Sequence, residues 1–348
     1  MAKKNQGIVS GVSIFVILFI GASYLAITYY NKIFNAAVKL DQEERYVYVQ
    51  SAWDRSQLID YLYQEGILLD TSSFIWTADK KSFFNPKAGR YLLKDGMSNN
   101  ELINLLRSGM QKPVKLTFSA IRTFEDLAAK VGEQIEVDSA TLLEAFKDPA
   151  LSKQFGFNGN TFFTMFLPNT YEFYWNTSAN DFIERMAREY KSFWTEERKA
   201  KARNLNLSQS EVAILASIVQ AEQMSHPDER PKVAGLYINR LRKGMRLQSD
   251  PTLIYALGDF TINRVLNEHK VIQSPYNTYI HAGLPPGPIN LPEISSLEAV
   301  LNYEEHSYLY MCAKADFSGY HHFSTTLSQH NVFANQYRRE LNRRRIMQ

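Results

Sequence analysis

The first thirty residues contain the strongest hydrophobic pattern of the chain. Residues 7–30 have no charged side chain and are dominated by Ile, Val, Leu and Phe. As a helix rising about 1.5 Å per residue, this run spans roughly 35 Å, which is enough to cross a bilayer with some tilt. Lys3 and Lys4 precede it, so the positive-inside rule places the N-terminus in the cytoplasm and the rest of the chain outside. We expect a cytoplasmic stub at residues 1–7 and an uncleaved membrane-spanning helix at residues 8–30.

A cleaved signal peptide is the alternative for this segment. The apolar run is longer than the hydrophobic region of a signal peptide, and no clear small-x-small cleavage site follows it. Tyr24, Tyr29 and Tyr30 lie where an interfacial aromatic belt would be. These features favour an anchor, with residues 31–45 as a polar connector.

A shorter mixed pattern occupies residues 46–110. Residues 46–49 alternate like a strand, and residues 90–93 predict a second strand after a Pro- and Gly-containing turn. Helical spacing ending in a glycine appears over residues 56–66, and again over residues 98–109 behind a serine cap. We expect a small α+β module.

From residue 111 to residue 348 the pattern is mainly helical, which predicts a second, larger domain. The aromatic segment at residues 166–173 predicts a turn. Helical composition or spacing recurs over residues 123–132, 139–146, 181–194 and 196–205.

The next helix has the most regular pattern in the chain. A capping box at residues 208–211 predicts where it begins. Its apolar stripe places Glu222 on the same face, at the end of the helix, and puts Gln220 about 200° away on the other side. The stripe consists of Val212, Leu215, Ile218 and Val219.

Glu222 is therefore the first candidate for chemistry. A carboxylic acid held against apolar surface has a raised pKa, which suits proton transfer. The alternative is a structural ion pair, for instance with Arg240 or Arg246, because a buried carboxylate without a partner is costly. The spacing alone does not separate the two.

Two further helices follow. Asp228 is expected to cap one that ends near Gly244, and Asn239 and Arg240 fall at the edge of its apolar stripe, either beside a cleft or on a solvated flank. Asp250 before Pro251 predicts the start of another helix, and the capping role is favoured over catalysis.

Composition narrows the classes of function. The chain has 348 residues, a formal net charge of +3 and one cysteine, Cys312. The small charge argues against nucleic-acid binding, and one cysteine excludes an intrachain disulfide and a cysteine-based metal cluster. The histidine spacing matches no zinc signature, so neither a metal nor a cofactor is expected. A solvated helix face is expected for the C-terminal arginines Arg338, Arg339, Arg343, Arg344 and Arg345.

Three long blocks stand out in the second half of the chain: LASIVQAEQ at residues 215–223, RPKVAGLYINRLRKGMRLQSDPTLIYALG at residues 230–258 and SPYNTYIHAGLPPGPI at residues 274–289. Together they resemble the endolytic murein transglycosylases of the YceG-like family. The resemblance is specific because its blocks are long, and it continues through residues 321–324 and 328–331.

The resemblance implies a fold and a reaction. The fold would be α+β, with the single membrane helix, a LysM-like module at residues 46–110 and a mainly helical mixed α+β catalytic domain with a lysozyme-like cleft at residues 111–348. The reaction would cleave the β-1,4 bond between N-acetylmuramic acid and N-acetylglucosamine and leave 1,6-anhydro ends. The protein would reside in the bacterial cytoplasmic membrane with its catalytic domain outside, beside peptidoglycan synthases.

The family's Ile-Val-Glu-Lys-Glu segment falls on residues 218–222, so the resemblance implies that Glu222 is the catalytic acid. The family's first glutamate is replaced by Gln220, which excludes a scheme using both carboxylates. His321 and His330 are expected to be structural. The substrate-binding residues implied by the resemblance are Asn239, Gln248, Asp250, Tyr276, Asn277, Tyr279 and Asn290.

Alternatives stay open both for single residues and for the whole protein. The residues around Tyr276 and the Pro-Pro-Gly segment are also explained as loop architecture. For the whole protein, the alternatives are a non-catalytic peptidoglycan-binding scaffold and a lysozyme-like hydrolase that uses Asp250 or Glu293 as nucleophile or base.

Overall fold

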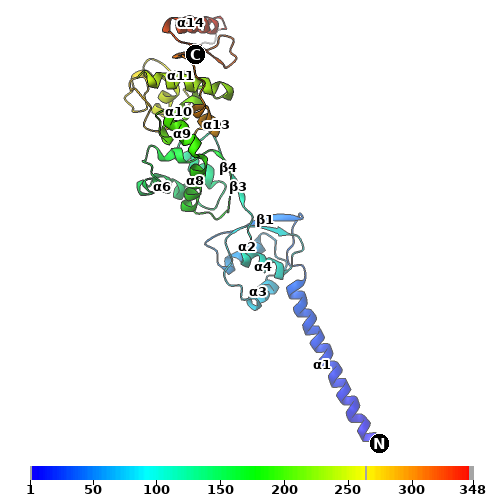
Figure 1. Cartoon of the computed structure of the whole chain (residues 1–348). Helices are drawn as coiled ribbons and strands as arrows, with labels where there is room; N and C mark the ends of the chain where they lie inside the picture. Colours follow the sequence, from blue (N-terminus) through cyan, green and yellow to red (C-terminus); the bar gives the residue numbers. More distant parts are fainter. Residues whose placement is uncertain (1, 263–264, 345–348) are drawn as a thin grey trace. The chain divides into compact units, whose positions relative to one another are not determined.

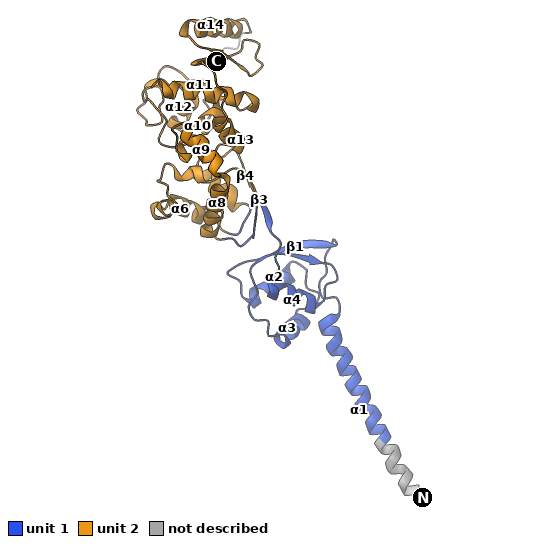
Figure 2. Ribbon diagram, viewed as in Figure 1, with its two compact units in different colours: residues 1–115, 134–136, 172–177 blue, residues 116–133, 137–171, 178–348 orange. Residues whose placement is uncertain are grey.

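The computed structural model describes residues 2–262 and 265–344, with side chains from residue 12 onward. The architecture is mixed α+β, as predicted, and the chain divides into two compact units (Figure 2). Unit 1 comprises residues 1–115, 134–136 and 172–177, and unit 2 comprises residues 116–133, 137–171 and 178–348.

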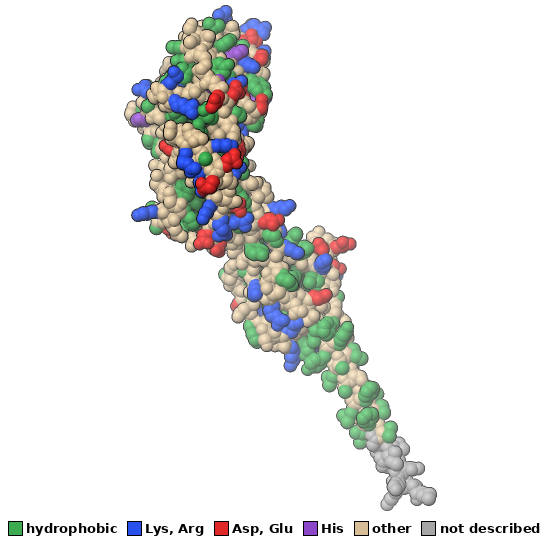
Figure 3. Space-filling model, viewed as in Figure 1, with side chains coloured by type: hydrophobic (Ala, Val, Ile, Leu, Met, Phe, Trp, Pro, Cys, Tyr) green, Lys and Arg blue, Asp and Glu red, His purple; other side chains and the backbone are tan. Residues whose placement is uncertain are grey.

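Helix α1 (Ala2–Phe34) begins unit 1. Its portion Val12–Phe34 is long and apolar enough to cross a membrane, a property that an anchor and a signal sequence share. Hydrophobic side chains cover the described surface of this helix (Figure 3), and Phe15 is 70% exposed. A single exposed apolar helix is thus present where the sequence predicts the membrane segment.

The rest of unit 1 is a small α+β body (Figure 1). Strands β1 and β2 pair antiparallel, with Glu44 opposite Lys94 and Val49 opposite Gly89. Helices pack over one apolar core that includes Val47, Leu62 and Tyr91. The elements in chain order are β1 (Glu44–Val49), α2 (Arg55–Gln64), α3 (Thr71–Lys80), β2 (Gly89–Lys94) and α4 (Asn99–Ser108).

Local sequence rules account for the helix boundaries in this body. The Ser98 hydroxyl accepts the Glu101 backbone N–H, and the Glu101 carboxylate accepts the Ser98 N–H, which is the predicted start of α4. Gly109 ends the helix at φ 74°, a conformation that glycine adopts without strain. Helix α3 was not predicted, although Asp70 caps its first turn.

Unit 2 contains most of the helices. Strands β3 (Val114–Phe118) and β4 (Asn169–Phe173), each with part of its residues in either unit, form a two-stranded sheet. The prediction of a turn at residues 166–173 is therefore wrong for its second half, because β4 pairs with a strand about fifty residues earlier in the chain. Between β3 and β4 the chain forms helices α5 (Phe124–Gly132), α6 (Ser139–Lys147), α7 (Pro149–Gln154) and the short η1 (Phe162–Met165). Helices α8 (Ala179–Phe193) and α9 (Glu196–Asn204) follow β4.

The core of unit 2 surrounds α10 (Gln209–Glu222). Helices α11 (Arg230–Arg242), α12 (Asp250–Leu257) and α13 (Ile294–Leu301) pack against α10, in the green to orange part of Figure 1. Every residue of α10 from 212 to 219 is buried. The short helices η2 (Pro227–Glu229) and η3 (His269–Val271) lie in the connections.

The predicted starts of α11 and α12 need correction. Asp228 lies in η2, and α11 begins after Glu229 without a side-chain cap. Ser249 is the N-cap residue of α12, so Asp250 is the first residue of the helix and does not cap it.

A hairpin and a helix end the described chain. Strands β5 (Tyr310–Ala313) and β6 (His321–Ser324) pair antiparallel, and α14 (Leu327–Arg343) packs against both. The arginines at 338, 339, 343 and 344 are exposed, which confirms a solvated face for them, and Arg345 lies outside the described residues.

Candidate active site

Glu222 is the last residue of α10, and its position follows from how that helix begins and packs. The predicted capping box is present: Ser208 N–H donates to the Glu211 carboxylate at 2.7 Å, and Glu211 N–H donates to the Ser208 hydroxyl at 3.2 Å. From this fixed start, burial of the apolar stripe sets the rotation of the helix. Glu222 is thereby turned toward α11 and the segment before α12.

Two hydroxyl groups hold the Glu222 carboxyl group. Tyr237 Oη donates to Glu222 Oε1 at 2.7 Å, and Ser249 Oγ donates to the same oxygen at 2.5 Å. Tyr237 and Ser249 are themselves buried, which fixes both donors. Among the described residues, both hydrogen bonds to this carboxyl group fall on Oε1, and Oε2 receives none.

A cavity of about 400 Å³ opens beside Glu222. Leu236 and Leu247, each 1% exposed, supply apolar wall. The polar wall comes from Tyr237, Arg240, Gln248, Asp250, Tyr279, His321 and His330, and strand β5 adds Tyr310, Met311, Cys312 and Ala313.

Burial raises the pKa of Glu222. The hydrogen bonds from Ser249 and Tyr237 oppose this because they favour the ionised form, and the nearby Asp250 carboxylate adds to the rise. The net direction is upward, so the acid holds its proton at a higher pH than an ordinary glutamate. This is the property that a general acid needs.

The ion-pair explanation of Glu222 finds no support among the described residues. Arg240 donates to the backbone carbonyls of Leu309 and Leu247 at 2.6 and 2.7 Å. Arg246 donates to the carbonyl of Tyr279 at 3.2 Å. Both predicted partners are thus used to hold backbone segments.

Gln220 points to a different part of the domain. Its Oε1 accepts the backbone N–H of Glu293 at 2.7 Å and the hydroxyl of Ser296 at 2.9 Å, at the N-terminus of α13. The predicted separation of Gln220 from Glu222 around the helix is therefore confirmed. A glutamine at this position supplies an acceptor oxygen for the N-terminus of α13.

Comparison with known proteins identifies the family of this chain. The sequence profile of the YceG-like family matches residues 47–336. The chain belongs to the YceG-like family. An endolytic murein transglycosylase of Bacillus subtilis is 29% identical over 337 residues, which covers 92% of this chain and 91% of the relative. One of Streptococcus pneumoniae is 28% identical over 288 residues, and the aligned region spans about half of that longer relative, 51%.

A solved structure agrees with this family assignment. A crystal structure described as that of a YceG-like protein of Listeria monocytogenes matches 83% of this chain and 98% of its own. The TM-score is 0.55 at 26% sequence identity. The similarity therefore extends well beyond the short motifs around Glu222.

Within this YceG-like chain, Gln248, Asp250 and Tyr279 line the Glu222 cavity. Tyr279 Oη donates to Asp250 Oδ1 at 2.5 Å. Gln248 adopts φ 52° and is exposed, with its backbone N–H bonded to the Thr278 carbonyl. These are the predicted binding residues that the fold brings together with Glu222.

The other predicted binding residues hold loops in place. Asn239 donates to the carbonyls of His306 and Tyr308, at 2.7 and 3.1 Å. Buried Asn277 donates to the carbonyls of Lys270 and Ile272.

Asn290 and Tyr276 also lie away from the lining of the Glu222 cavity. Asn290 donates to the Ser217 carbonyl of α10 at 2.9 Å. Tyr276 packs on Tyr255 with ring centroids 4.8 Å apart. Substrate contacts by these two residues, Asn239 and Asn277 stay predictions.

The Pro-Pro-Gly segment lines a second cavity of about 570 Å³ together with the start of α10. Leu284 and Pro285 face this space, as do Ser208 and Ile214. The Glu222 cavity has a different lining, which does not include this loop.

Glu293 belongs to another network. Its carboxylate accepts from the Arg230 guanidinium at 2.8 Å and from Ser295 at 3.1 Å, and these contacts hold its pKa below the usual value, chiefly through Arg230. It does not line the Glu222 cavity.

Tyr237 and Ser249 are the residues that sequence reasoning missed. Tyr237 lies among apolar residues of α11, and a tyrosine buried in this way needs a partner for its hydroxyl group. Ser249 gave no comparable signal. His321 and His330, expected to be structural, both line the cavity. In residues 2–262 and 265–344, no group of three or more His, Cys, Asp or Glu is placed to hold a metal ion.

Proposed function

We propose that this protein is a membrane-anchored endolytic transglycosylase that cleaves peptidoglycan glycan strands with Glu222 as its only proton-transfer residue. The observation that carries the proposal is the Glu222 carboxyl group, with a pKa raised by burial, at the wall of a cavity. The names of the curated relatives supply the substrate class. The position and the raised pKa of Glu222 support the proposed proton transfer.

The hydrogen-bond pattern assigns the two carboxyl oxygens. Oε1 already accepts from Tyr237 and Ser249, so the transferable proton resides on Oε2. In the cleavage step, Oε2–H donates to the glycosidic oxygen while the C1–O bond breaks. Tyr237 and Ser249 then stabilise the carboxylate that forms.

The second half of the reaction returns the proton. The C6 hydroxyl oxygen of the N-acetylmuramic acid residue bonds to C1, and its proton passes to the Glu222 carboxylate. The product ends in 1,6-anhydro-N-acetylmuramic acid and Glu222 is restored as an acid. Because the nucleophile belongs to the same sugar, the step gains an effective concentration on the order of 10⁵ M or more. No water-activating base is needed.

The remaining parts of the proposal concern location. Helix α1 would be the anchor, with the N-terminus in the cytoplasm and the chain after α1 outside, where nascent strands leave their synthases. The strand–helix–helix–strand body of unit 1 would be a LysM-like module that contacts glycan or orients unit 2, and the Glu222 cavity would be part of a lysozyme-like cleft.

One experiment separates this function from its alternatives. The full chain in detergent micelles is incubated with uncrosslinked glycan strands, and the products are analysed by mass spectrometry. Anhydro-ended fragments that disappear in Glu222→Gln are expected. Fragments heavier by one water molecule, with reducible ends, would identify a hydrolase using Asp250. Absence of any cleavage would favour the scaffold alternative.

A further inference from the structure

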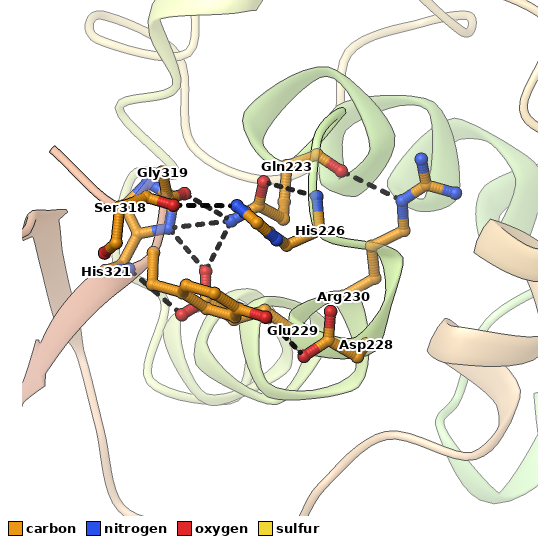
Figure 4. Close-up of polar contacts among 9 residues, drawn as sticks. Gln223, His226, Asp228, Glu229, Arg230, Ser318, Gly319 and His321 are labelled. Atoms are coloured by element: carbon orange, nitrogen blue, oxygen red, sulfur yellow. Dashed lines mark hydrogen bonds and ion pairs between the residues drawn. The ribbon is translucent and has the colours of Figure 1, made fainter.

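His321 is at the wall of the Glu222 cavity and also belongs to a second polar network, shown in Figure 4. This network joins the segment directly after Glu222, residues 223–230, to the start of strand β6. In the figure, the His321 and Glu229 side chains point toward one another. None of these contacts is used in the mechanism given above.

Glu229 is the centre of the network. It is buried, and its carboxylate accepts from His321 Nδ1 at 2.7 Å, from the His321 backbone N–H at 3.0 Å and from Gln223 Nε2 at 2.6 Å. Burial alone would raise the pKa of Glu229, but the hydrogen bonds from His321 and Gln223 outweigh it and hold the pKa below the usual value. Glu229 is thus an ionised acceptor.

An ionised acceptor determines which ring nitrogen of His321 has the proton. Nδ1 must donate to Glu229, so the neutral ring has its lone pair on Nε2. Among the described residues, no hydrogen bond to Nε2 is present. A carboxylate that orients an imidazole in this way is a recurrent arrangement where the other ring nitrogen acts on a ligand.

The hairpin does not need this ring bond to stay in place. Gln223 Nε2 donates to the Gly319 carbonyl at 3.0 Å, and His226 Nε2 donates to the Ser318 carbonyl at 2.8 Å. The His226 ring also stacks on Tyr320 with centroids 3.9 Å apart. These contacts, together with the His321 backbone N–H that donates to Glu229, already attach the turn between β5 and β6 to residues 223–229. The additional bond from Nδ1 therefore fixes the rotamer and the tautomer of the His321 ring.

We propose that His321 contacts the substrate: its Nε2 accepts a hydrogen bond from a sugar hydroxyl of the glycan strand bound in the Glu222 cavity. Glu229 is then a positioning residue that acts through His321. The inference rests on the proposed function because it takes a glycan as the occupant of the cavity. It gives the cavity a second point of substrate contact on β6, separate from the acid on α10.

Two substitutions of His321 separate substrate contact from structural support. An asparagine amide reaches the position of Nδ1 and keeps the bond to Glu229, whereas a glutamine amide reaches the position of Nε2 and keeps an acceptor in the cavity. We expect kcat/KM on uncrosslinked glycan strands to fall roughly tenfold in His321→Asn, the loss of one hydrogen bond, and to fall less in His321→Gln.

The order of the two variants decides the outcome. If His321 served only to hold the hairpin, His321→Asn would be the more active variant, and equal or better activity of His321→Asn overturns the inference. His322→Asn is the matched control, because His322 stacks on Phe333 of α14 at 4.3 Å and does not line the cavity; it should cleave like the unchanged protein. Failure of the proposed function is distinct, since the unchanged protein would then yield no anhydro ends.

Discussion

Replacement of Glu222 by glutamine is the most direct perturbation of the site, because it removes the proton and little else. The side-chain length is kept, and the amide oxygen accepts from Tyr237 and Ser249 as Oε1 does. The apolar stripe of α10 is untouched. A loss of activity in this variant therefore reports on proton transfer and not on packing.

The expected loss is large. General acid–base catalysis contributes typically about 10²- to 10⁴-fold, and Glu222 supplies the acid and then the base. We expect the rate of anhydro-end formation, followed by mass spectrometry of digested glycan strands, to fall roughly 10³-fold or more. Residual cleavage within tenfold of the unchanged protein would refute the assignment.

Stability gives a second, independent measurement on the same variant. Burial raises the pKa of Glu222 above its ordinary value of 4.5. A group whose folded pKa is raised binds its proton more tightly when folded, so the unchanged protein loses stability as pH rises from about 4.5 to the folded pKa. Glu222→Gln lacks this loss. Its melting temperature should therefore equal or exceed that of the unchanged protein, with the difference growing over that window.

A control at the other end of α10 isolates the effect of position. Glu211→Gln makes the same chemical change in the same helix, and glutamine also satisfies a capping box. It should cleave at the rate of the unchanged protein. Equal inactivation of both variants would show that α10, and not the Glu222 proton, is what the substitution disturbs.

Three further predictions concern neighbours of Glu222. Tyr237→Phe removes a donor that favours the ionised acid, so the basic limb of the pH–rate profile should move to higher pH; movement to lower pH would contradict the hydrogen-bond assignment. Gln220→Ala should lower the free energy of unfolding by about 1 kcal/mol, the usual effect of losing a cap, and leave kcat unchanged. Gln220→Glu should change neither the free energy of unfolding nor kcat. A large gain in activity from Gln220→Glu would show that the position is catalytic. Alkylation of Cys312, the single cysteine, should be slow near neutral pH because burial raises the thiol pKa, and it should accelerate as the pH rises. Because Cys312 lines the cavity, alkylation should block cleavage unless bound glycan strands protect the thiol. Full activity of the alkylated protein would show that substrate does not occupy this cavity.

The sequence predicted those features that depend on neighbouring residues. The capping box at Ser208 and the buried stripe behind it set the start and the rotation of α10, and these two facts direct Glu222 inward and Gln220 toward α13. The same is true of α4, whose serine cap and terminal glycine are both local signals. Helical period and end-capping operate within a few residues, so a single sequence contains them.

What the sequence did not predict depends on residues far apart in the chain. Ser249 reaches Glu222 across 27 positions, and His321 reaches Glu229 across 92. Strand β4 is stabilised by pairing with β3, and the residues of β4 alone do not predict this pairing. The resemblance predicts that Asn277 binds substrate, which stays a prediction, and the sequence did not show that its amide group donates to backbone carbonyls within its own loop. Side-chain type alone does not distinguish a binding amide from one that holds a loop.

The choice between transglycosylase and hydrolase depends on what Asp250 does in the shared cavity. Asp250 is exposed, and one of its carboxylate oxygens accepts a hydrogen bond from the Tyr279 hydroxyl group. Its negative charge raises the pKa of Glu222, which keeps the acid protonated before cleavage. A nucleophilic aspartate would have to give up that electrostatic role at the moment of attack, whereas an attacking C6 hydroxyl leaves the charge of Asp250 in place throughout. In the proposed reaction Asp250 therefore stays a spectator charge, and Glu222 alone exchanges protons.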